Sequence, residues 1–332
     1  MKAFLFSTCI LVLSVSTAYG SSGDRSTEFQ NCVSTCYGDH CHPWTTLPLD
    51  LRLTRWTCTD DCKYRCMHML TDKAISLGHD IQQYYGKWPF WRFLGMQEPA
   101  SVAFSLWNMW FHLQGAHQIR RKISASHPFR GYYLTWAYVS VNAWIGSTIF
   151  HTRDLPLTEK LDYFSAALAI LYPLYYTVIR MANWYPQPVK PDGSGRSFLR
   201  FGWSALCIIV YLSHVTYLSV LPRFDYSYNM TFNLILGISH NILWLFYSLP
   251  IPIFQRFPYA SKTYYPRHIY KAGIFVLLTT VATALELFDF PPLGRVLDAH
   301  ALWHLSTAPI AKFWYDFLVE DSQDRGWQSN QH

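Results

Sequence analysis

Charged residues are scarce in this chain of 332 residues. Aspartate, glutamate, lysine and arginine make up 14% of it, against about 25% in a typical soluble domain. Hydrophobic residues reach 51% and aromatic residues 18%, with 14 Trp and 23 Tyr. Low charge combined with abundant Trp and Tyr is typical of membrane proteins, whose aromatic side chains gather at the lipid–water interfaces. The composition therefore argues against an ordinary soluble domain.

Several sequence signatures are also missing. There is no glycine-rich phosphate loop, no basic and aromatic pattern of a nucleic-acid surface, and no internal repeat. The net charge of +6 is the amount that cytosolic loops of a membrane protein would carry, so we predict no nucleic-acid partner. The C-terminal residues hold neither a KDEL-type signal nor the hydrophobic tail that precedes a lipid anchor.

The first twenty residues are typical of a secretory signal peptide. Lys2 precedes an apolar stretch, and Ala18 and Gly20 place small residues at the −3 and −1 positions of a cleavage site. We predict a signal peptide over residues 1–20, with an uncleaved membrane anchor as the alternative. In either case the following segment starts outside the cytosol.

Cysteines are concentrated in the next segment, residues 21–98, which we predict to be a small lumenal domain. This density favours disulfides formed in an oxidising compartment. If the two cysteine groups lie on antiparallel helices, the pairs nest, which is one of fifteen possible connectivities. A zinc knuckle is the alternative, although the segment has no C-x-x-C spacing. The nested pairs would be Cys41–Cys58, Cys36–Cys62 and Cys32–Cys66.

From Pro99 onward, apolar runs are long enough to cross ~30 Å of hydrocarbon. We predict an all-α multi-pass membrane protein, with a seven-transmembrane bundle over residues 99–319 after the disulfide-rich domain. A cytosolic tail, 320–332, follows; it is polar from Asp321 onward, and we expect it to be flexible. The predicted spans are 100–120, 132–152, 160–182, 200–221, 231–250, 269–290 and 297–319.

Lysine and arginine alternate between the predicted loops. Loops after the first, third and fifth spans are rich in these residues, and the loops between them are poor. The positive-inside rule then places the N-terminal domain in the lumen and the C-terminus in the cytosol, in agreement with the signal peptide. The single glycosylation sequon begins at Asn229, in a predicted lumenal loop close to the fifth span.

Five polar residues fall at the lumenal ends of three predicted spans. Ser147 and His151 are four residues apart, as are His300 and His304, so each pair lies on one face of a helix. Asp162 stands near the start of the third span. Polar and ionisable groups are costly at membrane depth and are usually functional. The topology therefore predicts that these five groups converge on one side of the membrane.

A zinc ion suits this set of residues. Catalytic zinc sites use three protein ligands and leave one position open, and we predict His151, His300 and His304 as the ligands of one zinc per chain. Asp162 would accept a proton from water or orient a ligand imidazole. Ser147 would donate a hydrogen bond to a developing oxyanion, or alternatively act as a nucleophile.

Other polar residues have plainer interpretations. We interpret four further histidines within the predicted spans as packed or hydrogen-bonded residues and not as ligands, and three acidic residues near the lumenal face as supporting or interfacial groups. The histidines are His112, His117, His214 and His240, and the acidic residues are Glu286, Asp289 and Asp298.

These motifs resemble a known family. The pattern S-x-x-x-H, a later aspartate and a final H-x-x-x-H is similar to that of the CREST superfamily of seven-span membrane hydrolases. W-T-C-T-D-D-C-K-Y-R-C-M from Trp56, G-K-W-P-F from Gly86, Q-E-P-A-S from Gln97 and F-H-T-R-D from Phe150 resemble the Per1-like branch. The resemblance covers nearly all of the chain after the signal peptide.

The resemblance implies a Golgi membrane enzyme that removes the sn-2 acyl chain from GPI anchors. Its substrates would be GPI-anchored proteins in the lumenal leaflet, and the lyso-GPI product would then be reacylated. Two other functions stay open: a ceramidase-like amidase, which would share the metal site, and a non-catalytic receptor or chaperone with a structural zinc. The sequence leaves the oligomeric state undecided.

Overall fold

The computed structural model describes residues 21–186 and 194–328, so the predicted signal peptide lies outside the described residues. Within these ranges the chain is mostly helical, and β-structure is limited to three isolated bridges. The chain divides into two compact units. The N-terminal unit contains the described residues up to Leu47 together with Trp56–Pro89, and the helical unit contains Pro48–Arg55 and the described residues from Phe90 onward.

Two helices form the N-terminal unit, α1 (Thr27–His40) and α3 (Cys58–Ser76). Local caps explain where they begin. The Ser26 side chain accepts a hydrogen bond from the Phe29 amide, and Thr57 and Asp60 form a reciprocal capping box, which satisfies amides that have no partner within the helix.

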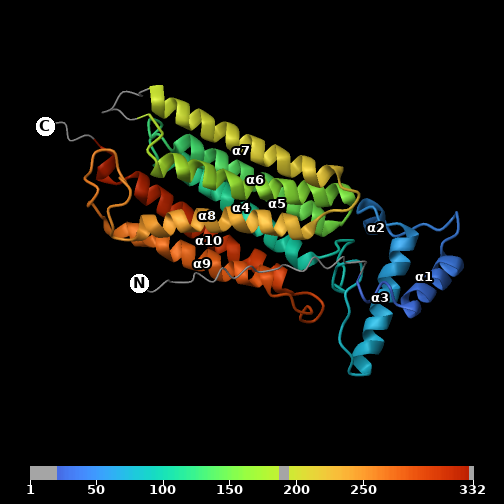
Figure 1. Cartoon of the computed structure of the whole chain (residues 1–332). Helices are drawn as coiled ribbons and strands as arrows, with labels where there is room; N and C mark the ends of the chain where they lie inside the picture. The colour runs from blue at the N-terminus through green and yellow to red at the C-terminus, as the bar shows by residue number, and fades with distance from the viewer. Residues whose placement is uncertain (1–20, 187–193, 329–332) are drawn as a thin grey trace, which may run out of the picture. The chain divides into compact units, whose positions relative to one another are not determined.

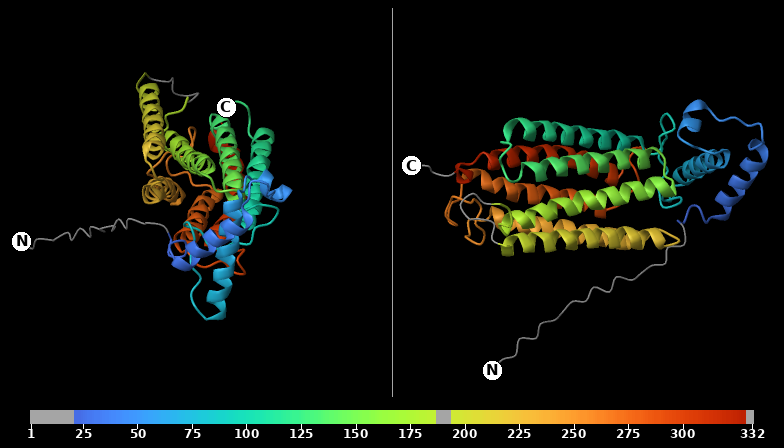
Figure 2. Two further views of the ribbon diagram at one scale, coloured as in Figure 1. Left: turned by 90° about the vertical axis from the view of Figure 1, so that its right-hand side faces the viewer. Right: turned by 90° about the horizontal axis from the view of Figure 1, so that it is seen from above.

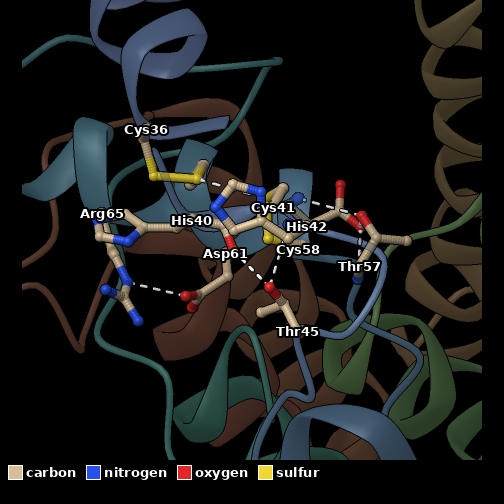
Figure 3. Close-up of a disulfide and its surroundings, with 11 residues drawn as sticks. Cys36, His40, Cys41, His42, Thr45, Thr57, Cys58, Asp61 and Arg65 are labelled. Atoms are coloured by element: carbon tan, nitrogen blue, oxygen red, sulfur yellow. Dashed lines mark hydrogen bonds and ion pairs between the residues drawn. A yellow bond between two sulfur atoms is a disulfide. The ribbon is translucent and has the colours of Figure 1, made fainter. Parts of the chain in front are cut away.

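Three disulfides join the two helices, and they confirm the predicted nested order. The pairs are Cys32–Cys66, Cys36–Cys62 and Cys41–Cys58. Figure 3 shows the region where the chain leaves α1 and returns to α3; there Thr45 accepts from the His42 amide and donates to the His40 carbonyl. The sulfur atoms of Cys41, Cys58 and Cys62 lie within 4.8 Å of one another, but all three belong to disulfides and cannot bind zinc as thiolates.

The helical unit contains seven long helices among the described residues, and short α2 (Leu49–Leu53) also belongs to it. In Figures 1 and 2 the long helices run along one another as a bundle, with α7 at its periphery. The long helices are α4 (Pro99–Lys122), α5 (Arg130–Thr152), α6 (Pro156–Met181), α7 (Ser194–Val220), α8 (Tyr226–Ser248), α9 (Tyr270–Leu287) and α10 (Ala299–Ser322).

Four of these helices, α6, α7, α8 and α9, are long and apolar enough to cross a membrane, so the chain is a membrane protein. Helices α4, α5 and α10 have 24, 23 and 24 residues, which also suffices in length. Their sequences are more polar than those of the four apolar helices, so composition alone does not mark them as membrane spans. The full set of seven spans therefore stays a prediction.

Helix α4 shows why these three helices are more polar. Its buried face carries Ser101, Ser105, Asn108 and His112, spaced three or four residues apart along one side of the helix. This polar stripe packs against α5 and α10. Gly115 continues the stripe and brings α10 close, because a Cβ there would come within 2.3 Å of the Tyr315 ring.

A buried ion pair lies at the C-terminal end of α10. Arg180 Nη2 donates to Asp321 Oδ2 at 2.5 Å, and the two side chains are 2% and 0% exposed. Arg180 also donates to the hydroxyls of Tyr133 and Tyr247, and Tyr247 donates to the second carboxylate oxygen of Asp321. The network joins α5, α6, α8 and α10.

The C-terminal segment is ordered further than we predicted. Helix α10 continues to Ser322, and a short helix, η2, follows at Arg325–Trp327. The Trp327 indole donates to the Asp321 carbonyl oxygen at 2.9 Å. The expectation of a flexible chain from Asp321 is therefore wrong for residues 321–327, because the buried ion pair and the Trp327 contact hold them.

The glycosylation sequon begins within a helix. Asn229 lies in the first turn of α8 and is 5% exposed. Its side-chain oxygen accepts a hydrogen bond from Asn233 at 3.3 Å. The folded chain therefore does not present this amide at its surface.

Removing one disulfide, in Cys36→Ala/Cys62→Ala, is expected to destabilise the N-terminal unit by about 3 kcal/mol, because the open loop gives the unfolded chain more freedom. Limited proteolysis of the full-length protein in increasing denaturant measures this as earlier cleavage within residues 21–89. Cys207→Ser, at the buried unpaired cysteine of α7, is the control and should cleave as the wild type does. Equal protection of the double variant would contradict the prediction.

Replacing one partner of the buried ion pair should cost more than replacing both. Asp321→Leu leaves a buried guanidinium without its counter-ion, for a loss of about 3–5 kcal/mol, and Arg180→Met/Asp321→Leu should recover part of this loss. Thermal unfolding of the detergent-purified variants tests the order. A double variant that melts below the single variant would show that lost packing, not the unpaired charge, is decisive.

Candidate metal centre

Three imidazole rings converge where α5 ends and α10 begins. His151 lies in the last turn of α5, and His300 and His304 lie in the first two turns of α10. The Nε2 atom of His300 is 3.3 Å from Nε2 of His151 and 2.8 Å from Nε2 of His304. The three rings can each offer one ligand atom within 4.8 Å of the others. The structure thus brings together the three predicted ligands.

Two of the rings are held by carboxylates. His151 Nδ1 is 2.7 Å from Glu98 Oε2, and His300 Nδ1 is 2.7 Å from Glu286 Oε2. An ionised carboxylate can only accept a hydrogen bond, so each Nδ1 donates to its carboxylate, and in the neutral form of each ring Nε2 offers a lone pair. A carboxylate behind a ligand histidine is the usual arrangement in metal sites.

A serine holds the third ring. The Ser105 hydroxyl donates its only hydrogen to the Ser101 carbonyl at 2.7 Å. With this hydrogen so placed, the Ser105 oxygen can accept from His304 Nδ1, 3.1 Å away, and from the Ser147 hydroxyl, 3.0 Å away. In this arrangement each neutral ring carries its proton on Nδ1 and offers Nε2 to a cation between the three rings. This donor set fits a cation that binds imidazole, such as zinc.

Backbone contacts position the elements that carry these groups. The amides of Gln97 and Glu98 donate to the carbonyls of Thr152 and His151, both at 3.0 Å. Glu98 thus contacts His151 through both its backbone and its side chain, and Pro99 then begins α4. A proline suits this first helical position because its missing amide would have no partner there.

Helix α10 is fixed at its first turns. The Asp298 side chain caps α10 by accepting a hydrogen bond from the Ala301 amide at 2.8 Å. Asp298 thus supports the site by fixing where the helix begins. Asn108 of α4 donates to the His304 carbonyl at 2.7 Å. These contacts place His300 and His304 opposite the end of α5.

The two predicted catalytic residues lie on neighbouring helices, Ser147 on α5 and Asp162 on α6. Ser147 is 5% exposed and reaches His304 only through Ser105. Asp162 lies on α6, where α6 packs closely on α5: a Cβ built on Gly146 would be 3.4 Å from the Asp162 Cα. Glu98 and Glu286 contact two of the imidazole rings. Both roles predicted for Asp162, accepting a proton and orienting a ligand imidazole, stay predictions.

Sequence reasoning missed two residues of this site, Glu98 and Ser105, and it gave Glu286 only a general supporting role. Glu98 contacts a residue 53 positions away, and Ser105 one 199 positions away, so no local spacing links them. The available signal for Glu98 was an acidic residue immediately before the first predicted span. For Ser105 it was the polar stripe Ser101, Ser105, Asn108.

The other histidines lie apart from this cluster. His112 Nδ1 contacts the Tyr315 hydroxyl at 2.8 Å, and His240 accepts from the Trp244 indole at 3.1 Å. His214 stacks on Phe232 with ring centroids 3.9 Å apart. His117 is exposed, whereas we had interpreted it as a packed or hydrogen-bonded residue. The interpretation as packed or hydrogen-bonded residues is confirmed for the first three.

Comparison with known proteins extends the likeness over the whole chain. A model of the Per1-like family matches residues 48–322. The PER1 homolog of Schizosaccharomyces pombe is 41% identical over 322 residues, which cover 95% of this chain and 91% of the relative. The GPI-specific phospholipase A2-like PGAP3 of Cricetulus griseus is 40% identical over 319 residues, and that of Homo sapiens 38% over 320; each match covers 94% of this chain and 93% of the relative.

We expect the purified protein to contain about one zinc ion per chain, and His300→Ala to lose it. Glu98→Gln should leave the His151 ring in place but orient it less firmly, which lowers the metal affinity about 10–100-fold. Elemental analysis after dialysis against a graded chelator measures both effects. His112→Gln is the matched control, since it changes a buried histidine of α4 outside the cluster; equal metal loss in this control would contradict the assignment.

Proposed function

Because the chain belongs to the Per1-like family, we propose that it is a zinc-dependent hydrolase that removes the sn-2 acyl chain from GPI anchors. The observation that carries this proposal is the convergence of the three histidines, which can each offer one ligand atom within 4.8 Å of the others. Relatives named GPI-specific phospholipase A2-like support the substrate class. In the reaction, water adds to the ester carbonyl, and the carbon–oxygen bond to glycerol breaks. The products are a free fatty acid and lyso-GPI.

The three histidines would hold the metal through their Nε2 atoms. When bound there, zinc supplies a Lewis acid that polarises the ester carbonyl and activates water. Glu98, Glu286 and Ser105 keep the rings in the tautomer that binding requires. The His300 side chain is 35% exposed and Glu286 is 24% exposed, while His151 and His304 are buried. The substrate would therefore approach from the side of His300 and Glu286.

Ser147 serves better as a hydrogen-bond donor than as a nucleophile. Its hydroxyl contacts the hydroxyl of Ser105 at 3.0 Å, and that oxygen already accepts from His304. A nucleophilic serine needs a base that removes its proton, and Ser105 cannot do so. Rotation of the Ser147 hydroxyl would instead direct its hydrogen to an oxyanion that forms on the substrate.

Asp162 would accept the proton that the attacking water loses and pass it to the leaving glycerol oxygen. General acid–base catalysis of this kind contributes about 10²–10⁴-fold to a rate. The close packing of α6 on α5 at Gly146 places Asp162 on the neighbouring helix at the level of Ser147.

We further propose that the site faces the lumen of the Golgi apparatus and that the C-terminus is cytosolic. The distribution of lysine and arginine along the sequence supports this orientation, and the Golgi location rests on the family resemblance. GPI-anchored proteins occupy the lumenal leaflet, so a site at that depth would meet the ester group of their anchors.

The activity test uses the purified full-length protein with a diacyl GPI-anchored protein, and mass spectrometry of the released fatty acid. We expect His300→Ala to abolish release, Ser147→Ala to slow it about 10²–10³-fold, and Asp162→Asn to slow it about 10²–10⁴-fold. His112→Gln should retain activity.

The same variants separate the alternative functions. Release of fatty acid from ceramide, but not from the GPI-anchored protein, would replace the proposal with an amidase. Full activity of metal-free His300→Ala would exclude hydrolysis at this site. A wild-type protein that holds zinc but releases fatty acid from neither substrate would favour the non-catalytic receptor or chaperone.

A further inference from the structure

A second site lies between α4 and α10, at the end of these helices away from the histidine cluster. It is a groove of about 670 Å³, within the usual range for ligand sites. Its residues on α4 begin at Trp110 and end at Lys122, beyond Asn108, which donates to the His304 carbonyl. Lys312 and Tyr315 line it on α10, two turns or more past His304. The groove is therefore separate from the metal centre.

The floor of the groove is rigid. Tyr315 is 1% exposed, its hydroxyl is held by His112 at 2.8 Å, and its ring packs directly on Gly115. A side chain at position 115 would collide with this ring, so the glycine sets the spacing of the two helices here. The groove is thus shaped by buried contacts and does not depend on surface side chains alone.

The two ends of the groove differ in chemistry. Trp110 and Phe111 form one end, and Trp110 is 55% exposed. Arg121 and Lys122 form the other end. At 1.5 Å per residue, Phe111 and Arg121 are separated by roughly 15 Å along the helix axis. An apolar end and a cationic end at this distance match an acyl chain and a charged headgroup.

Charge at the basic end is not balanced by the protein. Lys312 Nζ pairs with Asp316 at 2.7 Å, and Gln118 donates to the other oxygen of Asp316 at 2.8 Å. The Lys312 ammonium therefore lies toward the basic end. Asp316 is one carboxylate beside three cations, and Arg121 makes no ion pair with an acidic residue in the described parts of the chain. The basic end keeps an excess of positive charge for a ligand.

We propose that this groove binds an anionic phospholipid, with its phosphate at Arg121, Lys122 and Lys312 and an acyl chain along Trp110 and Phe111. A soluble phosphate compound would use only the cations, and the exposed aromatic end would have no ligand. In the predicted topology the basic end is cytosolic, so the lipid belongs to the leaflet opposite the metal centre.

To test this proposal, the full-length protein is placed in nanodiscs of dioleoylphosphatidylcholine with a minor share of dioleoylphosphatidylserine. Native mass spectrometry then identifies the lipids that stay bound when the protein is released from the nanodiscs. We expect preferential retention of phosphatidylserine. Each removed cation should weaken the retention of phosphatidylserine about fivefold. The double variant Arg121→Gln/Lys312→Gln should therefore retain this lipid about 25-fold less strongly than the wild type. Arg120→Gln is the matched control, because the Arg120 guanidinium lies over Tyr138 and does not line the groove.

Two further arms identify the ligand. Trp110→Ala should weaken retention of phosphatidylserine, and glycerophosphoserine, the same headgroup without acyl chains, should compete only weakly. The metal content and melting temperature of each variant report that it is folded. The proposal is overturned if phosphatidylcholine is retained as tightly, if Arg120→Gln weakens retention as much as Arg121→Gln, or if glycerophosphoserine competes as well as the lipid.

Discussion

The convergence of three imidazole rings is the constraint on which the rest of the bundle depends. The Nε2 atom of His300 lies 2.8 Å from that of His304 and 3.3 Å from that of His151, and two nitrogen lone pairs at such distances repel each other unless a proton or a metal cation lies between them. The fold sustains this arrangement because each ring is held from behind, by Glu98, Glu286 or Ser105. These three partners come from the segment before α4, from α9 and from α4, so the cluster requires α4, α5, α9 and α10 together.

Polar groups in an apolar environment divide the bundle into two kinds of helix. Helices α4, α5 and α10 carry the serines, the asparagine and the histidines of the centre, and they are too polar to qualify as spans by themselves. Helices α7 and α8 are the opposite: only 17% and 22% of their most apolar stretches are buried. Buried hydrogen bonds offset the cost of the polar helices, and the apolar helices provide surface for lipid.

Helix α10 is held at both ends by polar contacts with different helices. At its start, His304 contacts Ser105 of α4 and His300 contacts Glu286 of α9. At its end, Asp321 pairs with Arg180 of α6 and Tyr247 of α8. Because both ends are fixed, the two histidines cannot move along the helix axis relative to His151. Between these ends α10 also forms one wall of the basic and aromatic groove.

Local spacing in the sequence was sufficient for much of this protein. The separation of His300 from His304, and the intervals between cysteines, predicted the histidine cluster and the three nested disulfides, because residues four apart share a helix face. Contacts between distant segments were decided only by the tertiary structure. Glu98 and Ser105 joined the site, and Asp321 became a buried anchor instead of part of a flexible tail. The physical reason is that a hydrogen bond or ion pair between remote residues depends on how helices pack. The residue pattern of one helix does not specify which residue of another helix will be the partner.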